Sequence, residues 1–299
     1  MNSHPFTVRD IGNRFERLRE LLKKERIISI NKCENSGIVL SLNKEKSLIE
    51  LIFFSILLHS GFSLNKENKN LEIKGRGIDI HIKSAETNSI LQSLLHHNEE
   101  ILLSRAEELF NSLIAIYISS HLNGKGFCFK FLYPNAYIKE IKSNSNDTHE
   151  IDILGCITKN NENIYIMIET TSGYFKKESD RCECEKETHN WHFKKAIFKK
   201  WAIEKIFKIK INLIYITIRK LNSIEDENTE KDIFIEKILQ EDPSIQIVSW
   251  LPHPEANIKL LLFSESNYMD NFNLIKEKFL MPIRECIENC LENPSADSP

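Results

Sequence analysis

The sequence is poor in glycine and proline and carries no strong excess of charge, and each shortage excludes a class of protein. Its 299 residues include 9 Gly and 8 Pro, and they contain neither the P-loop pattern GxxxxGK[ST] nor the dinucleotide-binding pattern GxGxxG. Both patterns bring a glycine-rich backbone close to phosphate groups, so we expect no nucleotide-binding loop of either type. The formal net charge is -3, so any positive surface for nucleic acid has to be local.

Long apolar runs and paired cysteines are also missing. The most apolar stretch, residues 48–58, includes Glu50 and is too short to span a bilayer, so we expect a buried helix and no membrane partner. The 7 Cys are an odd number spread through the chain, which indicates reduced thiols rather than a disulfide framework. The first residues lack the basic region and apolar run of a signal peptide. The sequence therefore predicts a cytoplasmic globular protein.

The chain does contain a regular succession of helical and strand patterns. Helices are predicted at residues 7–25, 43–59, 89–97, 100–121, 190–208, 230–240 and 272–291. Strands are predicted at residues 27–30, 38–40, 71–82, 127–133, 150–158, 164–171, 212–218, 245–250 and 258–263, with a turn at 134–135 and a polar loop at 172–188. From residue 100 to residue 250 the predicted order is helix, three strands, helix, strand, helix, strand.

Two of these strands, residues 150–158 and 164–171, form the most informative stretch. Side chains alternate across a strand, so a hairpin of the two can set Asp152 and Glu169 side by side on one face. Neighbouring carboxylates on a sheet repel each other and lose solvation, and a divalent cation relieves both costs. Hard oxygen ligands suit Mg²⁺, which polarises a phosphodiester and activates water. The alternative is a surface hairpin with two solvated acids.

The segments Glu150-Ile-Asp-Ile-Leu-Gly and Ile166-Met-Ile-Glu-Thr-Thr, joined by a turn, resemble the core of the PD-(D/E)XK nuclease superfamily, also called the restriction-endonuclease-like fold. In that family an Asp on one strand is followed by Glu-x-Lys on the next. The family's αβββαβ core has the same order as the predicted elements. The resemblance implies an α/β fold with a mixed central sheet flanked by helices in residues 96–299, after an N-terminal α+β region in residues 1–95 to which no chemistry is assigned.

The resemblance also implies a set of metal ligands. Asp152 and Glu169 match the Asp and Glu of the family motif and would bind Mg²⁺ or Mn²⁺. The helix before the strands often adds a Glu in this family, and Glu107 and Glu108 are both candidates for this position. The alternative is that either of them is a solvated surface residue.

The sequence departs from the family where Thr171 replaces the expected Lys, which normally steadies the attacking water and the developing phosphate charge. Some members supply a Lys from the following helix, where Lys194 and Lys195 are the candidates for this catalytic role. They flank a predicted apolar stripe that consists of Trp191, Phe198, Ala202 and Ile209. Seven Lys and one Glu lie between residues 194 and 210, and Lys199 and Lys200 are predicted to contact nucleic acid. The alternative is a solvated helix face.

A rival group of side chains precedes and enters this helix. Cys182, Cys184, His189 and His192 offer the Cys₂His₂ ligand set of structural zinc sites, although the CxC spacing is tighter than usual. The same residues also fit a flexible polar turn, with His192 as a neighbour of the active site.

The sequence thus leads to three functional hypotheses. The first is a metal-dependent nuclease that hydrolyses phosphodiester bonds in DNA, within a microbial defence or restriction system, either as a homodimer or with a defence-system partner protein. The second is a catalytically inactive protein that keeps the nuclease fold and binds nucleic acid or acts as a scaffold, for which Thr171 is the main support. The third is a zinc-stabilised interaction module.

Overall fold

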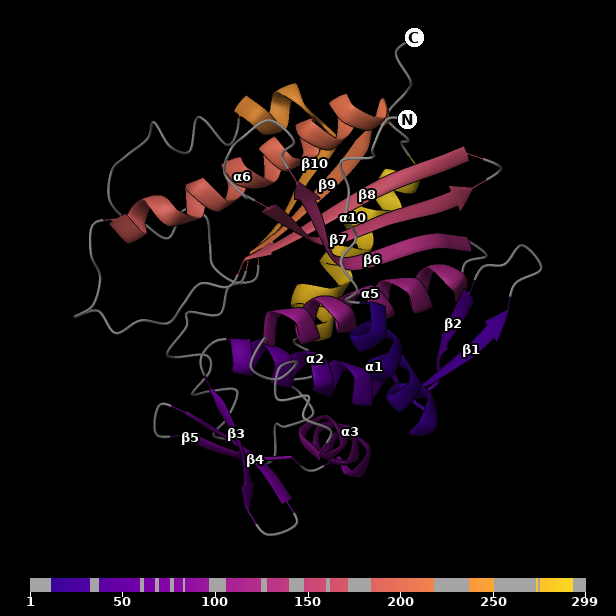
Figure 1. The fold of residues 1–299 in the computed structure, drawn as a ribbon, viewed down its shortest axis with the longest axis vertical. Coiled ribbons are helices and arrows are strands. Elements are labelled where there is room, and N and C mark those ends of the chain that lie inside the picture. Colours follow the sequence, from indigo (N-terminus) through magenta and orange to yellow (C-terminus); the bar gives the residue numbers. More distant parts are fainter. Residues whose placement is uncertain are drawn as a thin grey trace.

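The structure is a computed structural model, and its described elements form a mixed α/β fold (Figure 1). A five-stranded sheet lies at the centre, helices cover it, and smaller antiparallel sheets belong to the N-terminal part. The residues that the structure describes are 12–32, 38–59, 62–67, 70–75, 78–82, 84–96, 106–124, 128–139, 148–159, 162–171, 184–217, 237–249, 273 and 275–292.

The central sheet is mixed, with the strand order β10-β9-β8-β7-β6. The first three strands along the chain, β6, β7 and β8, pair antiparallel, whereas β9 and β10 run parallel to β8. The parallel step from β8 to β9 is made by the helix α6. The five strands are β6 (Cys128–Lys139), β7 (Thr148–Lys159), β8 (Glu162–Thr171), β9 (Ile211–Thr217) and β10 (Ile245–Ser249), and α6 spans Cys184–Phe207. The predicted α/β class and the predicted order of these elements are confirmed.

Two apolar cores form on the two faces of this sheet, because side chains alternate along each strand. On β8, Ile166 and Ile168 belong to the core that α5 (Ala106–Gly124) and α10 (Met281–Glu292) cover, while Met167 belongs to the core under α6. The same alternation on β9 sends Leu213 and Tyr215 toward α6. Glu169 follows Met167 at a spacing of two, so the sheet directs it to the α6 face.

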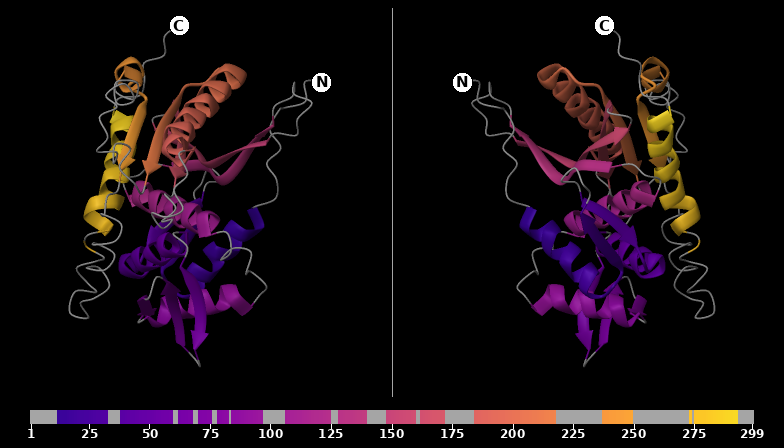
Figure 2. Two further views of the ribbon diagram at one scale, coloured as in Figure 1. Left: turned by 90° about the vertical axis from the view of Figure 1, so that its left-hand side faces the viewer. Right: turned by 90° about the vertical axis from the view of Figure 1, so that its right-hand side faces the viewer.

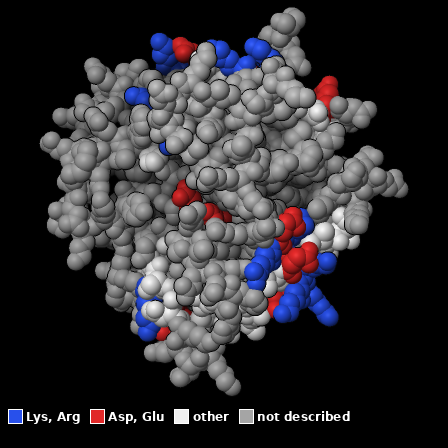
Figure 3. Space-filling view, viewed as in Figure 1, with Lys and Arg blue, Asp and Glu red and all other residues white. Residues whose placement is uncertain are grey.

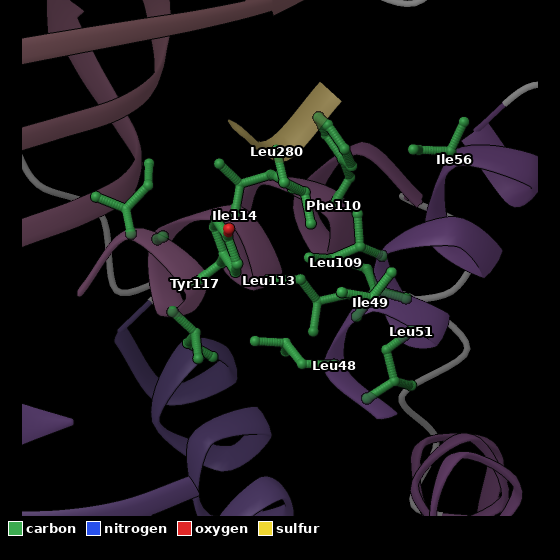
Figure 4. Close-up of a cluster of buried hydrophobic side chains, with 14 of the residues drawn as sticks. Leu48, Ile49, Leu51, Ile56, Leu109, Phe110, Leu113, Ile114, Tyr117 and Leu280 are labelled. Carbon is green, nitrogen blue, oxygen red and sulfur yellow. The ribbon is translucent and has the colours of Figure 1, made fainter. Parts of the chain in front are cut away.

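The helix α5 lies in the middle of the molecule and is buried on nearly every side. It packs on the sheet through β6 and β7, and on the N-terminal part through α2 (Glu45–His59) and β2 (Ile38–Leu42), as both side views in Figure 2 also show. Leu109 and Leu113 lie toward Leu48 and Ile49 of α2, while Phe110 and Ile114 lie toward Leu280 on the other side of α5 (Figure 4). One continuous cluster of buried side chains therefore crosses the predicted boundary between residues 95 and 96.

This continuity predicts that both parts unfold together. Leu113 is fully buried, so Leu113→Ala is expected to lower the free energy of unfolding by about 2–5 kcal/mol. Urea denaturation followed by circular dichroism should give one transition at lower urea. Leu21→Ala, at a half-buried position on α1 (Gly12–Lys24), should cost less. A second transition that keeps its midpoint in Leu113→Ala would show instead that residues 1–95 fold independently.

The N-terminal part contains the helices and strands that its sequence predicts, with one addition. Two small antiparallel sheets, β1-β2 and β3-β4-β5, accompany the helices α1, α2 and α3. The strand β3 (Ser63–Glu67) was not predicted, because its polar side chains give no strand pattern. The predicted elements of this part whose bounds have not yet been given are β1 (Ile28–Lys32), β4 (Asn70–Gly75), β5 (Ile78–His81) and α3 (Ala85–His96).

Two predicted boundaries were wrong. The predicted turn at Pro134 lies inside β6, which tolerates proline because it is an edge strand with one free side. The predicted loop 172–188 ends early, since α6 begins at Cys184. The predicted C-terminal helix 272–291 is confirmed, since the described residues are helical at 273 and 275–292 and include the π-helical turn η3 (Lys276–Leu280) before α10. The predicted strand 258–263 and most of the predicted helix 230–240 lie outside the described residues, which are helical at 237–241.

Two further findings concern helix apolarity and the cysteines. Among the described helices, none combines the length and the apolarity that a bilayer crossing requires. The cysteines with described side chains, Cys156, Cys286 and Cys290, carry reduced thiols.

Candidate functional site

The candidate site lies where β7 and β8 stop pairing. Their antiparallel ladder runs from Lys159 opposite Glu162 to Ile153 opposite Ile168 and ends there. Asp152 and Glu169 would form the next pair, so the end of the ladder sets these two carboxylates beside each other, and both are buried.

Where the backbone ladder ends, the Asp152 side chain accepts hydrogen bonds from β8. Its Oδ2 accepts a hydrogen bond from the Thr170 backbone N–H at 2.5 Å and another from Thr170 Oγ1 at 2.8 Å. A charged acceptor makes these bonds stronger than those between neutral groups. The Thr170 hydroxyl also lies 3.0 Å from Asn111 Oδ1, which comes from α5 on the other face of the sheet. Asp152 is therefore fixed from β8 and, through Thr170, from α5.

Lys199 of α6 completes the cluster. It is buried, and its Nζ donates a hydrogen bond to Glu169 Oε2 as an ion pair. Its helical neighbours Phe193, Ala196 and Ile203 are buried against β8 and β9 in the α6 core. An ammonium at such a position needs a partner, because an isolated buried charge is strongly disfavoured. Glu169 supplies that partner, and the residues Asp152, Glu169 and Lys199 are called the carboxylate–lysine cluster below.

The cluster holds two carboxyl groups and one ammonium in a buried site, and burial raises both carboxyl pKa values. For Glu169, burial and then the nearby Asp152 charge raise the pKa from 4.5 to about 8, although Lys199 opposes the rise. Burial also raises the pKa of Asp152, against the opposing effects of Lys199 and the Thr170 hydrogen bonds. Two acids in one water-poor site are typical of groups that share a cation or a proton.

The donor set fits a hard divalent cation. Within the described part of the chain, Glu169 Oε1 is buried and has no hydrogen-bond partner, so one carboxylate oxygen is left for a further ligand. Mg²⁺ is often held by one or two carboxylates, with water and phosphate oxygens completing its octahedron. Asp152 and Glu169 can supply this number. Among the described residues, no group of three or more His, Cys, Asp or Glu side chains is placed to hold a metal ion.

The two predicted glutamates of α5 differ in their surroundings. Glu107 is exposed, whereas Glu108 is buried. Asn111, one turn after Glu108 and itself fully buried, contacts Thr170, which in turn binds Asp152 of the cluster. Sequence reasoning missed Asn111, since a lone Asn inside a helix carries no pattern that distinguishes it from a solvated residue.

The lysines of α6 are placed differently from the prediction. Lys194 is exposed and Lys195 half-buried, and the ammonium that contacts Glu169 is that of Lys199. Lys200 is also buried, and its Nζ lies 2.8 Å from Glu204 Oε1 and 2.9 Å from Asp242 Oδ2. The prediction that Lys199 and Lys200 offer surface charge to nucleic acid is therefore corrected: both point inward.

The cause is the rotation of α6 about its axis. The predicted stripe included Phe198, whose exposed fraction is 42%. The buried face instead passes through Phe193, Ala196 and Ile203, nearly on the opposite side of the helix. A sequence signal did exist, because these three residues follow helical spacing. Lys199 and Lys200 interrupt this face, which hides its apolar character.

His192 lies near the cluster at the start of the described α6 side chains. Although the His192 side chain is exposed, partial burial of the imidazole and then the charges of Lys195 and Lys199 lower its pKa, while Asp152 acts in the opposite direction. The neutral imidazole is thereby favoured at neutral pH. The zinc prediction stays untested, because Cys182 lies outside the described residues and the side chains of Cys184 and His189 are not described.

The raised pKa of Glu169 predicts a pH dependence of stability that Glu169→Gln removes. A carboxyl group with a higher pKa in the folded state contributes stability that is fully present below 4.5 and is lost as the pH rises to about 8. The free energy of unfolding of the parent, relative to Glu169→Gln, should therefore fall over this interval. Urea denaturation of both proteins without divalent cations measures the difference. Parallel pH profiles would contradict a raised pKa.

Comparisons with known proteins add little to this geometry. No family model matches the chain, and no curated protein matches it. A search of solved structures found the crystal structure of protein VC1899 from Vibrio cholerae, with a TM-score of 0.32 and 11% sequence identity. The match covers 79% of this chain and 46% of that chain, so this chain spans less than half the length of that structure. A similarity at this TM-score carries no argument about fold or function.

Proposed function

We propose that the protein is a metal-dependent nuclease of the PD-(D/E)XK type that hydrolyses phosphodiester bonds. The observation that carries the proposal is the carboxylate–lysine cluster, which joins two buried acids and one buried ammonium at the end of the β7–β8 ladder. The element order α5, β6, β7, β8, α6, β9 in a mixed sheet also agrees with the αβββαβ core of that superfamily.

Each residue of the cluster has a role in this proposal. Asp152 and Glu169 hold the divalent cation, which supplies polarisation of the phosphate and activation of water when it is bound. Lys199 brings a positive charge to Glu169 from α6 and stabilises negative charge that develops on the phosphate. Thr170 and Asn111 keep Asp152 oriented. Lys199 thus replaces the lysine that is missing at Thr171, in place of Lys194 or Lys195.

The wider parts of the proposal come from the family resemblance. DNA is the expected substrate, cytoplasm the expected compartment, and microbial defence or restriction the expected setting. A second copy of the chain or a defence-system protein is the expected partner. Mg²⁺ or Mn²⁺ is the expected cofactor, in agreement with the oxygen donors of Asp152 and Glu169.

A second function is favoured by one observation. The Lys199 ammonium already neutralises Glu169 directly, so the cluster has a cation of its own without a metal. A protein that keeps the nuclease fold and binds nucleic acid without cleaving it would use Lys199 in this way, as a structural ion pair.

The two functions differ in metal binding and in cleavage. The nuclease should bind Mn²⁺, as measured by calorimetric titration, and should cut plasmid, linear duplex, single-stranded DNA or RNA in Mg²⁺ or Mn²⁺ but not in EDTA. Glu169→Gln should weaken both the Mn²⁺ affinity and the cutting. A folded protein that binds nucleic acid, takes up no Mn²⁺ and cuts none of these substrates would refute the nuclease and support the inactive fold.

A further inference from the structure

Two large aromatic side chains are exposed on α6. Phe198 and Trp201 are 42% and 55% exposed, and they are the exposed large hydrophobic residues of the described part of the chain. Their ring centroids lie 6.4 Å apart with the planes tilted by 41°. The Lys205 ammonium lies 4.8 Å from the centroid of the Trp201 ring, a cation–π distance. These rings do not contribute to the α6 core, which is formed by the opposite side of the helix.

The rings belong to a longer row along the outer face of α6. Lys194, Phe198, Trp201 and Lys205 recur at spacings of four, three and four, so they share one face of the helix. The row covers about 16 Å of helix axis at a rise of 1.5 Å per residue. Lys194 and Lys205 are both exposed. These four residues are called the α6 row.

The α6 sequence around the row is basic. Between residues 194 and 210 the sequence has seven Lys and one Glu. That acid, Glu204, binds the Lys200 ammonium and the Ile211 backbone N–H, at 2.8 and 2.9 Å. Lys208 is exposed just beyond the helix end. In Figure 3, Lys and Arg side chains, with an acidic side chain among them, lie along the upper edge of the molecule, the region where Figure 1 shows α6, β9 and β10. This positive region contrasts with the overall charge of -3.

We infer that the α6 row is a contact surface for single-stranded nucleic acid. Its bases stack on Phe198 and Trp201, and its phosphates lie near Lys194 and Lys205. Exposed rings on a convex helix can stack on unpaired bases, whereas the bases of a duplex are already stacked on each other. The inference takes its substrate class from the proposed nuclease and names the strand type and the surface that bind it.

The charge of the α6 row favours a nucleic acid over a protein as the binding partner. The fully buried core of a protein–protein interface is depleted of charged residues, and Lys is depleted across interfaces. The α6 row instead alternates aromatic rings with lysines, the combination of stacking platform and positive charge that single-strand-binding grooves use. A polyanion with aromatic bases satisfies both parts of the row at once.

Fluorescence anisotropy in EDTA tests the surface without cleavage. The probes are a labelled oligo(dT) strand and a labelled duplex of equal length, at one fixed salt concentration. The parent should bind the single strand more tightly. Phe198→Ala/Trp201→Ala should weaken single-strand binding by about ten-fold or more, since stacking on one ring contributes about 1–3 kcal/mol. Phe198→Tyr/Trp201→Phe keeps two rings and should restore most of the affinity.

Lysine variants separate the row from general charge. Lys205→Ala should weaken binding and make the salt dependence less steep. The matched control is Lys23→Ala, which removes an exposed lysine from α1 and should leave both quantities unchanged. Because all of these side chains are exposed, circular dichroism of the variants should match that of the parent.

The outcomes are distinct. Unchanged single-strand affinity in Phe198→Ala/Trp201→Ala would overturn the inference. If this variant lost self-association but still bound oligo(dT), the inference would also fail, and the α6 row would be a contact between copies of the chain. Cleavage by Phe198→Ala/Trp201→Ala is measured separately with Mg²⁺. If no variant and no parent protein cuts, while ring removal still weakens oligo(dT) binding, the α6 row stands and the proposed nuclease fails.

Discussion

An Asp152→Asn variant is expected to lose cleavage by about a thousand-fold or more while it keeps its fold and its affinity for nucleic acid. Asn has nearly the size of Asp, and its Oδ1 can still accept the hydrogen bonds from Thr170 that orient the side chain. What the variant loses is the negative charge that would hold a divalent cation beside Glu169. The substitution therefore separates the charge of Asp152 from its place in the hydrogen-bond network.

The measurement is the initial rate of cleavage of a labelled strand in Mg²⁺, with melting temperature as the check on folding. The variant should not become less stable, because it removes one of two repelling buried acids. Glu107→Gln is the matched control, since it removes an exposed carboxylate from α5 and should leave the rate unchanged. A parent-like rate in Asp152→Asn would mean that any nuclease activity belongs to another site or to a contaminant.

The pairing of Asp152 with Glu169 could be predicted from the sequence because it depends on short-range rules. Strand alternation fixes the face of each side chain, and the short polar turn between the strands makes the hairpin local. The prediction did not include the end of the ladder at Ile153 and Ile168, where the two acids sit just beyond the last pair. That end follows from the path of both strands in the whole sheet, which no local pattern encodes.

The third member of the cluster could not be predicted, because it depends on how α6 is rotated on the sheet. Hydropathy assigns Lys to the surface, so a helix face that includes Lys199 and Lys200 scores poorly as a buried face. Both are buried because acids from other elements meet them, Glu169 from β8 and Asp242 from the turn before β10. Their burial is a consequence of tertiary pairing, and the separation in sequence from these acids is 30 and 42 residues.

The same limit explains Pro134 and Asn111. A proline predicts a turn in isolation, but an edge strand accepts it, and which strand lies at the edge is a property of the sheet order. Asn111 is buried in a helix where a polar residue looks solvated, and only the arrival of Thr170 from β8 gives it a partner. In each case the missing information is the identity of a neighbour distant in sequence.

Lys199→Met is the second substitution with a large expected effect. Met keeps the length and the apolar part of the Lys side chain within the α6 core and removes the ammonium. The rate of cleavage should fall by about a hundred- to a thousand-fold, the range observed when one preorganised charge-stabilising donor is removed. Lys195→Met is the matched control on the same helix, since Lys195 lies outside the α6 row, and it should keep most of the parent rate. Loss of activity in Lys195→Met with full activity in Lys199→Met would return the role to the lysine that the sequence favoured.

Thermal stability with and without metal then tells whether Lys199 acts only as a structural ion pair. Without a cation, Lys199→Met leaves Asp152 and Glu169 adjacent and buried with no positive charge, so the variant should melt at a lower temperature than the parent. Mg²⁺ or Mn²⁺ should raise the melting temperature of the variant more than that of the parent, because the ion supplies the charge that the ammonium supplied. A stabilised but slow enzyme would place Lys199 at the reacting phosphate. A variant that metal does not stabilise would instead show that Asp152 and Glu169 bind no cation, and the lysine would then be the only charge that the two acids share.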